Sequence, residues 1–266
     1  MQHLFDFWDS FVSSMKDAPY VLLLSDYDGT LTPIASRPEE AVLSPTVRNK
    51  LLVLSQRANF SIGIISGRSL AEIKDMVELE GIYYIGNHGM EIAGPGISFV
   101  NSEAQGAQSV IKRLAGRLSD QLGDVEGVIV EDKGLSLSVH YRLVEEAEVK
   151  RVADIFQQST RHLREKGRIR VTSGKKVWEV RPPVDWHKGK AVMAIGVGLK
   201  ARYKLERLMI IYLGDDTTDE DAFSMVKRPQ GWSIFVGGEN PASSADYFLN
   251  STSDVDDFLS RLIELK

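Results

Sequence analysis

LLLSDYDGTLTPI, residues 22–34, is the stretch that decides the fold. With Tyr20 and Val21 in front of it, its first part is an uninterrupted apolar run, which is typical of a strand buried on both faces of a parallel sheet. The run ends on two carboxylates, Asp26 and Asp28, which a glycine and a threonine follow. Because charged groups are costly to bury, we expect the strand to stop there and to open onto a site.

Further apolar runs alternate with predicted helices along the chain. A serine cap before Pro45 marks the start of one helix, SLAEIKDMVELEG (69–81) predicts a second that ends at Gly81, and a last helix is predicted to start at a Ser253 cap. This alternation is typical of an α/β domain built on a parallel sheet. The other predicted strands are FSIGIIS (60–66), IYYIG (82–86), LMIIYLGD (208–215) and WSIFV (232–236).

A different pattern, helix–strand–strand repeated twice, occupies residues 98–184. It predicts a small α+β module whose antiparallel sheet has helices on one face, inserted near Gly94-Pro95-Gly96 and left near Pro182-Pro183. An inserted module of this kind can act as a lid over a site. The predicted domains are a first core part (1–97, with an N-terminal helix over 1–18), an inserted cap domain (98–184) and a second core part (185–266).

The composition excludes several classes of protein. A formal net charge of −5 argues against a general nucleic-acid binder, which carries a basic surface. The chain has no cysteine, so disulfides, thiolate metal sites and cysteine nucleophiles are excluded. The N-terminus lacks the pattern of a signal peptide, and no run reaches the roughly 20 apolar residues of a membrane span. We therefore expect a cytoplasmic protein with neither nucleic acid nor a membrane as a partner.

Polar residues follow three of the predicted strands: Asp26 and Asp28, then Ser66-Gly67-Arg68, then Asp215-Asp216. In open α/β sheets ligands bind at the carboxyl ends of the strands, so we expect these residues to converge. Grouped carboxylates repel unless a cation joins them, and an oxygen-only set suits Mg²⁺, which also binds phosphate. One carboxylate can then act as a nucleophile through an aspartyl phosphate, and the second as a general acid and base.

Four motifs resemble those of haloacid-dehalogenase (HAD) phosphotransferases and follow in the same order. They are DYDGT (26–30), ISGR (65–68), the Lys188 of HKGKA, and GDDTTDED (214–221). Within that superfamily, DYDGTLTPI, GNHGMEI (86–92) and GDDTTDED are similar to trehalose-6-phosphate phosphatases, from about residue 20 to the final helix. The resemblance implies a Rossmann-like core with a cap, and Mg²⁺-dependent hydrolysis of trehalose 6-phosphate through an aspartyl phosphate.

The resemblance also implies a role for each matching residue. Asp26 attacks phosphorus, and Asp28 protonates the leaving sugar oxygen and then activates water. Ser66 and Lys188 bind the transferring phosphoryl group. The residues implied for the metal are the Asp26 side chain, the Asp28 carbonyl, Asp215 and, nearby through waters, Asp219.

Candidate sugar-binding residues come from strand parity and from the resemblance. Alternate residues share a face, which places Ser136, Ser138, His140 and Arg142 on one polar face of the inserted module. That face is either solvated surface or the roof of the site. In the family, an E-x-K element and a GK…E element of the cap bind the disaccharide. The predicted substrate-binding residues are Glu131, Lys133, Arg142, Lys175 and Glu179 of the module, with Asn87, His88 and Arg68 of the core.

Several alternatives remain open. The same core serves phosphatases for sucrose phosphate and glycosyl-3-phosphoglycerates. A degenerate, non-catalytic sugar-phosphate sensor is disfavoured, because no motif position has been lost. A phosphomutase usually needs a different cap. A receiver-type signalling domain needs only about half this length and has no use for the acid at Asp28. The sequence leaves open whether a synthase partner binds.

Overall fold

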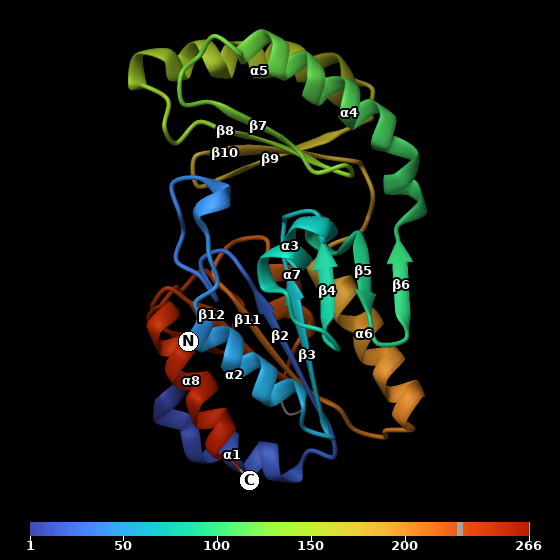
Figure 1. The fold of residues 1–266 in the computed structure, drawn as a ribbon, viewed down its shortest axis with the longest axis vertical. Helices are drawn as coiled ribbons and strands as arrows, with labels where there is room; N and C mark the ends of the chain where they lie inside the picture. The colour runs from blue at the N-terminus through green and yellow to red at the C-terminus, as the bar shows by residue number, and fades with distance from the viewer. Residues whose placement is uncertain (228–230, 266) are drawn as a thin grey trace. The chain divides into compact units, whose positions relative to one another are not determined.

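The chain folds into two compact units in a computed structural model that describes residues 1–227 and 231–265. The core unit comprises residues 1–99 and 186–266, and the cap unit comprises residues 100–185 (Figure 1). The boundaries expected from the sequence, 97/98 and 184/185, differ from these by two residues and one residue. Among the helices of the described residues, none combines the length and apolarity needed to cross a bilayer.

The core unit is built on a nine-stranded sheet with the order β1-β13-β12-β11-β2-β3-β4-β5-β6. The central strand β2 pairs in parallel with β11 on one side and β3 on the other. The five predicted strands are confirmed, each within two residues. The strands are β1 Gln2–His3, β2 Val21–Asp26, β3 Phe60–Ile65, β4 Tyr83–Gly86, β5 Glu91–Gly94, β6 Ile97–Val100, β11 Met209–Gly214, β12 Gly231–Val236 and β13 Tyr247–Leu249.

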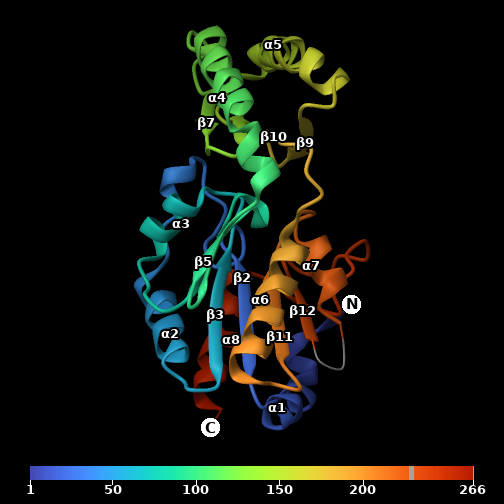
Figure 2. The same ribbon diagram turned by 90° about the vertical axis from the view of Figure 1, so that its right-hand side faces the viewer.

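Helices cover both faces of this sheet, as a strand apolar on both sides requires. Val21 and Leu23 pack into one hydrophobic cluster, and Leu22 and Leu24 into another on the opposite face. Figure 2 shows α2 and α3 on one side of the sheet and α6 and α7 on the other. The helices are α1 Trp8–Asp17, α2 Pro45–Ser55, α3 Leu70–Val77 and α8 Thr252–Glu264 on the first face, and α6 Lys188–Tyr203 and α7 Glu220–Met225 on the second.

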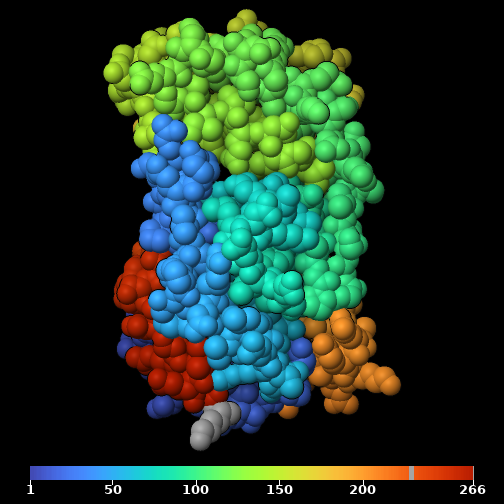
Figure 3. Space-filling model, in the orientation of Figure 1, coloured from blue at the N-terminus to red at the C-terminus, as the bar shows by residue number. Residues whose placement is uncertain are grey.

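Helices α2 and α8 lie side by side although some 200 residues separate them in the chain (Figure 3). The Lys50 Nζ atom donates to the Asp256 carboxylate at 2.6 Å and so joins the two helices. The predicted start of α2 is confirmed, because the Ser44 side chain accepts a hydrogen bond from the Val47 N–H at 3.2 Å.

Two predicted helix ends are wrong. Helix α3 stops at Val77 rather than at Gly81, because Glu78 adopts a left-handed conformation (φ 50°) and its N–H closes the helix on the Lys74 carbonyl. Helix α8 begins at Thr252, so Ser251 rather than Ser253 precedes it.

The predicted helix over residues 1–18 is also only partly correct. Gln2 and His3 form strand β1, which pairs in parallel with β13 through Gln2 and Tyr247. A 3₁₀ turn over Leu4–Phe7 follows, and α1 begins at Trp8. The partner strand lies near the other end of the chain, so the local pattern of apolar residues carries no sign of this pairing.

Strands β5 and β6 were not predicted and extend the core sheet by a hairpin. Gly94-Pro95-Gly96, where the insertion was predicted to start, is the turn of this hairpin, and Gly96 has φ +78°. The cap unit begins at Val100, the last residue of β6.

The cap unit has the predicted helix–strand–strand order, twice. Its antiparallel sheet has the order β7-β8-β10-β9, and Leu137, Val139 and Val180 pack in one cluster with α4 and α5. The predicted parity of β8 is confirmed, since its apolar residues lie under the helices. The elements are α4 Ser102–Leu122, β7 Ile129–Asp132, β8 Leu137–His140, α5 Glu146–Glu165, β9 Arg170–Gly174 and β10 Val177–Arg181.

Candidate active site

Three carboxylates converge at the carboxyl ends of β2 and β11. Asp26 is the last residue of β2, Asp215 follows β11, and Asp219 precedes α7. One oxygen of each lies within 4.8 Å of the others. The predicted convergence of these acids is therefore present in the structure.

Lys188 joins two of these carboxylates. Its Nζ atom donates to Asp26 Oδ1 at 2.6 Å and to Asp219 Oδ1 at 2.7 Å, and its side chain is only 2% exposed. Lys188 is the first residue of α6, where the helix dipole disfavours a cation. The two carboxylates offset that cost. The position of Lys188 is therefore explained by its contacts to the carboxylates and not by any preference of the helix.

The charges at this point leave room for a cation. Burial raises the pKa of Asp26 well above its usual value; Lys188 opposes that shift, while Asp219 and Asp215 add to it. Burial acts to lower the pKa of Lys188, but Asp219 and Asp26 outweigh it and the pKa rises. Three carboxylates and one ammonium group leave a net negative charge when the acids are ionised. The carboxylate oxygens of such a cluster fit a divalent ion such as Mg²⁺.

Gly29 explains why a glycine follows Asp28. Its φ is +91°, and a Cβ atom there would overlap the carboxylate of Asp215. The chain turns sharply at this point, because the Gly29 N–H donates to the Thr32 carbonyl at 2.7 Å. Only glycine satisfies both the conformation and the close approach, which places Asp215 directly beside the end of β2.

Arg68 holds Asp28 in a two-point contact. Its Nε donates to Asp28 Oδ2 at 2.8 Å and one terminal nitrogen donates to Oδ1 at 2.7 Å. The same guanidinium also contacts Glu72 and donates to the Pro38 carbonyl. Arg68 was predicted to bind substrate, but it is 5% exposed and most of its donors are engaged within the protein. This geometry indicates that it orients the Asp28 carboxylate.

Ser66 follows β3 and lies in the same strand-end region. It is 1% exposed, and its Oγ accepts from the Arg68 N–H at 3.1 Å while its own N–H donates to the Ile85 carbonyl at 2.9 Å. The imidazole of His88 lies against Gly67, where a Cβ atom would be 2.6 Å from His88 Cε1 and Nε2. The glycine of ISGR therefore makes space for this histidine.

Asn87 and His88 share an unusual backbone conformation. Their φ angles are 48° and 56°, in the left-handed region that non-glycine residues seldom adopt. Both are buried, and Asn87 Nδ2 donates to Glu91 Oε2 at 2.6 Å, while the Leu70 N–H at the start of α3 donates to the same oxygen. Asn87, which was predicted to bind substrate, thus stabilises this turn through its hydrogen bond to Glu91.

Two glutamates flank a serine on the polar face of the cap sheet. Ser138 is paired with Glu131 on one neighbouring strand and with Glu179 on the other. Lys133 Nζ lies between the two carboxylates, 3.7 Å from Glu131 Oε2 and 3.8 Å from Glu179 Oε1. Three of the predicted cap residues are therefore together.

Two further residues complete this group, and one of them, His140, was a weaker sequence candidate. His140 Nε2 lies 2.8 Å from Glu131 Oε2, and Arg181 Nε donates to Glu179 Oε2 at 2.6 Å. The other two predicted cap residues lie at the exposed end of the sheet, where an Arg142 nitrogen donates to the Lys175 carbonyl at 2.7 Å.

Tyr212 is the core residue that sequence reasoning missed. It is fully buried on β11, and its hydroxyl donates to Asp219 Oδ1 at 2.6 Å. Burial, and then Asp219, raise its pKa well above the usual value, so the phenol keeps its proton. In the sequence, only its position near the end of a strand that leads into the GDD motif pointed to a role. Aromatic residues are common in buried strands, so this position did not single it out.

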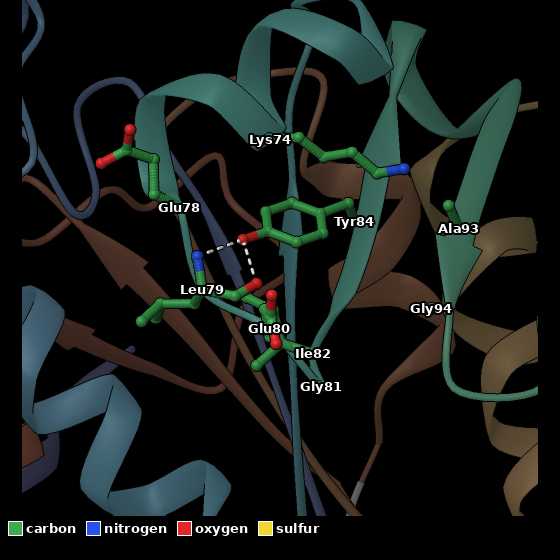
Figure 4. A pocket seen from close by; sticks show the side chains of 9 residues that line it. All are labelled: Lys74, Glu78, Leu79, Glu80, Gly81, Ile82, Tyr84, Ala93 and Gly94. Carbon is green, nitrogen blue, oxygen red and sulfur yellow. Dashed lines mark hydrogen bonds between the residues drawn. The ribbon is translucent and has the colours of Figure 1, made fainter.

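A pocket of the core contains none of the predicted site residues (Figure 4). It lies between the end of α3 and strands β4 and β5. The Tyr84 hydroxyl there accepts from the Leu79 N–H at 2.9 Å and donates to the Leu79 carbonyl at 2.7 Å. Its lining residues are Lys74, Glu78, Leu79, Glu80, Gly81, Ile82, Tyr84, Ala93 and Gly94.

Comparisons of the chain with known proteins give a consistent picture. A family model described as trehalose-phosphatase matches residues 24–253. Probable trehalose-phosphate phosphatase D of Arabidopsis thaliana is 35% identical, over 96% of this chain and 70% of its own length. Trehalose-phosphate phosphatase of Mycobacterium bovis is 39% identical, over 89% of this chain and 60% of its own length.

Solved structures agree with this assignment at the level of the fold. The C-terminal domain of C. albicans trehalose-6-phosphate phosphatase superimposes with a TM-score of 0.79 at 25% identity, covering 97% of each chain. A haloacid dehalogenase-like hydrolase from Bacteroides thetaiotaomicron superimposes with a TM-score of 0.60 at 14% identity, which shows the fold alone.

Proposed function

Because this chain belongs to the trehalose-phosphatase family, we propose that it hydrolyses trehalose 6-phosphate to trehalose and phosphate. The observation that carries the proposal is the arrangement around Asp26. A buried carboxylate at a strand end contacts Lys188, and a second carboxylate, Asp28, follows two residues later. This arrangement supplies a nucleophile, a phosphate-binding cation and an acid–base group within one site.

The first half-reaction transfers the phosphoryl group to Asp26. An Asp26 oxygen attacks phosphorus, the bond from phosphorus to the sugar oxygen breaks, and Asp28 gives its proton to that leaving oxygen. Lys188 offsets charge on the phosphoryl oxygens, and the buried Ser66 hydroxyl donates to one of them. Phosphoryl transfer depends mostly on positioning and electrostatics, so the rigid contacts of Lys188 and Arg68 serve the reaction directly.

The second half-reaction releases phosphate. Asp28, now ionised, takes a proton from a water molecule that attacks phosphorus, and the bond to the Asp26 oxygen breaks. Arg68 keeps the Asp28 carboxylate in one orientation between the two steps through its paired hydrogen bonds. The second carboxylate thus acts first as an acid and then as a base.

The acidic group at the strand ends is the proposed Mg²⁺ site. The Asp26 and Asp215 side chains and the Asp28 backbone carbonyl would hold the ion, which stabilises negative charge on the phosphoryl oxygens. HAD phosphatases generally use a divalent metal, and the close carboxylate oxygens at these strand ends fit one.

Mg²⁺ is expected to stabilise the folded protein. Binding to the native state alone at 100 times Kd adds about 2.7 kcal/mol to the free energy of unfolding. Urea unfolding of the chelator-treated protein, with and without added Mg²⁺, measures this difference. Asp215→Asn serves as the control and should show little gain. An unchanged midpoint in the wild type, with activity intact in excess chelator, would reject the metal site.

The cap carboxylates are proposed to bind sugar hydroxyls. Glu131, Lys133 and Glu179 are mutually close on one face of the cap sheet, where they can accept and donate several hydrogen bonds. Lys175 and Arg142, at the exposed end of the sheet, and Asn87 and His88 in the core remain predicted contributors. Arg181 and His140 each contact one of the two glutamates and so orient them.

Glu179→Gln is expected to raise KM for trehalose 6-phosphate about tenfold, because hydrogen bonds to charged groups contribute about 1.5–3 kcal/mol. Asp26 and Lys188 are untouched by this substitution, so kcat should change little. Steady-state kinetics test this, with the exposed Glu165→Gln on the same unit as control. A lower kcat at an unaltered KM would place Glu179 outside the sugar site.

Phosphate release from a panel of esters tests the proposed substrate. The panel contains trehalose 6-phosphate, sucrose phosphate, glucosyl- and mannosyl-3-phosphoglycerate, and glucose 6-phosphate. A preference in kcat/KM for trehalose 6-phosphate of ~10²-fold, or about 2.7 kcal/mol, is the expected result. A flat profile would keep the phosphatase chemistry and reject the disaccharide assignment. No release from any ester would favour the sensor.

The remaining partner predictions stay predictions. They are a cytoplasmic location, the absence of a nucleic-acid or membrane partner, and an open question about a synthase partner.

A further inference from the structure

The carboxylate of Asp219 has no acceptor position to spare. Its Oδ1 accepts from Lys188 Nζ at 2.7 Å and from the Tyr212 hydroxyl at 2.6 Å. Its Oδ2 accepts from the backbone N–H groups of Asp215 and Asp216 at 3.1 and 3.2 Å. A carboxylate offers about four lone-pair positions, so four donors occupy them all. A metal ion could bind Asp219 only by displacing one of these donors.

Tyr212 is a donor to Asp219 from inside the core. A phenol carries one hydrogen, and this one points at Oδ1 from a side chain that is 0% exposed. Its ring packs edge-to-face on Phe223 of α7, with centroids 5.6 Å apart. The ring is therefore held by packing, and its hydroxyl fixes the position of the Asp219 carboxylate.

The backbone at Gly214 leaves the space for this carboxylate. A Cβ atom at Gly214 would overlap the Asp219 side chain. Asp219 stands at the start of α7, yet its side chain makes no cap hydrogen bond to that helix. It points instead toward β11 and the loop after it. The side chain therefore bonds to Tyr212 and to the loop backbone rather than capping α7.

The consequence falls on Lys188. A lysine ammonium has three donors, and Asp26 and Asp219 take two of them among the described residues. With two directions fixed, the third can meet a phosphoryl oxygen in one orientation. Ordering a free lysine side chain costs up to about 2 kcal/mol of rotamer entropy. Because the contact to Asp219 already orders Lys188 in the free enzyme, substrate binding does not have to supply this free energy.

We propose that Tyr212 and Asp219 form a buried positioning chain that orients Lys188 toward the phosphoryl group, and that Asp219 does not ligate the metal ion. The inference rests on the proposed function for its kinetic test, but not for its metal-binding test. It replaces the expectation that Asp219 serves the metal.

Tyr212→Phe is the first test, because it removes one hydrogen bond and changes no charge. We expect kcat for trehalose 6-phosphate to fall about tenfold, as for a lost hydrogen bond to a charged group, with KM and the Kd for Mg²⁺ within about twofold of wild type. Tyr84→Phe is the matched control, since it also removes a buried tyrosine hydroxyl, one that hydrogen-bonds to the Leu79 backbone away from the carboxylates. It should keep kcat while losing comparable thermal stability. If Tyr212→Phe matches Tyr84→Phe in kcat, the positioning role is rejected.

Titration of Mg²⁺ alone into the full chain after removal of bound metal by a chelator is the second test. Asp219→Asn removes a charge near the ion, whereas Asp215→Asn removes a charge and a ligand. We expect the Kd of Asp215→Asn to exceed that of Asp219→Asn by about tenfold or more. Equal losses of affinity would show that Asp219 is a ligand and would overturn the proposal. This result needs no substrate, so it stands apart from any failure of the proposed activity.

Discussion

Asp26→Asn is expected to reduce kcat for trehalose 6-phosphate by at least about 10⁴-fold, or about 5.5 kcal/mol of transition-state stabilisation. The amide oxygen of asparagine is a poor nucleophile, so the aspartyl phosphate cannot form. The fold should persist, because Asp26 is isosteric with asparagine and Lys188 retains Asp219 as a partner. Steady-state phosphate release measures the loss.

A trapped intermediate gives an independent readout of the same prediction. Acid quenching of the wild-type enzyme during turnover should leave one phosphoryl group on the peptide that contains Asp26, and the Asp26→Asn protein should carry none. The exposed Asp75→Asn is the control and should behave as wild type. Normal phosphate release by Asp26→Asn would rule out nucleophilic catalysis at this residue.

Lys188→Met carries the second large effect, on both rate and stability. Loss of the phosphate-binding cation should lower kcat by about 10²–10³-fold, as for other groups that stabilise transition-state charge. Asp26 and Asp219 would remain buried without their cation, which costs about 3–5 kcal/mol of unfolding free energy. Kinetics with saturating Mg²⁺ and urea unfolding measure the two effects.

The control for Lys188→Met is Lys112→Met, an exposed lysine on α4. It should change neither quantity beyond about 0.5 kcal/mol, as is usual for surface substitutions. A stable Lys188→Met protein with wild-type kcat would show that the ammonium group neither binds phosphate nor holds the carboxylates.

Much of the core could be derived from local patterns. The run that ends at Asp26 is apolar on both faces, and only a strand between two helical layers accommodates that pattern. The carboxyl ends of such strands meet at one edge, so the sequence predicts that Asp26 and Asp215 lie close together. The order of the four motifs then indicated the chemistry.

Two short elements of the core sheet escaped prediction, for different reasons. Strand β1 exists because Gln2 and His3 pair with β13, and the local pattern of residues 1–18 reads as a helix. The β5–β6 hairpin is short and follows two left-handed residues, Asn87 and His88, which periodicity does not foresee. The partner of β1 is remote in sequence, so local propensity carries no record of that pairing, whereas β5 pairs with the neighbouring β4 and was missed because the hairpin strands are short.

The side-chain assignments divide in the same way. The residue types and their spacing, from Asp26 and Asp28 to Lys188, could be recognised from the chain alone, because they match the motifs of the family that the sequence resembles. Which atoms meet was decided by folding. Arg68 donates two hydrogen bonds to Asp28. Asp219 accepts hydrogen bonds from Tyr212, Lys188 and two backbone N–H groups, which occupy all its acceptor positions. Hydrogen-bond saturation depends on distances set by the packing of separate strands and helices, and a linear sequence does not contain those distances.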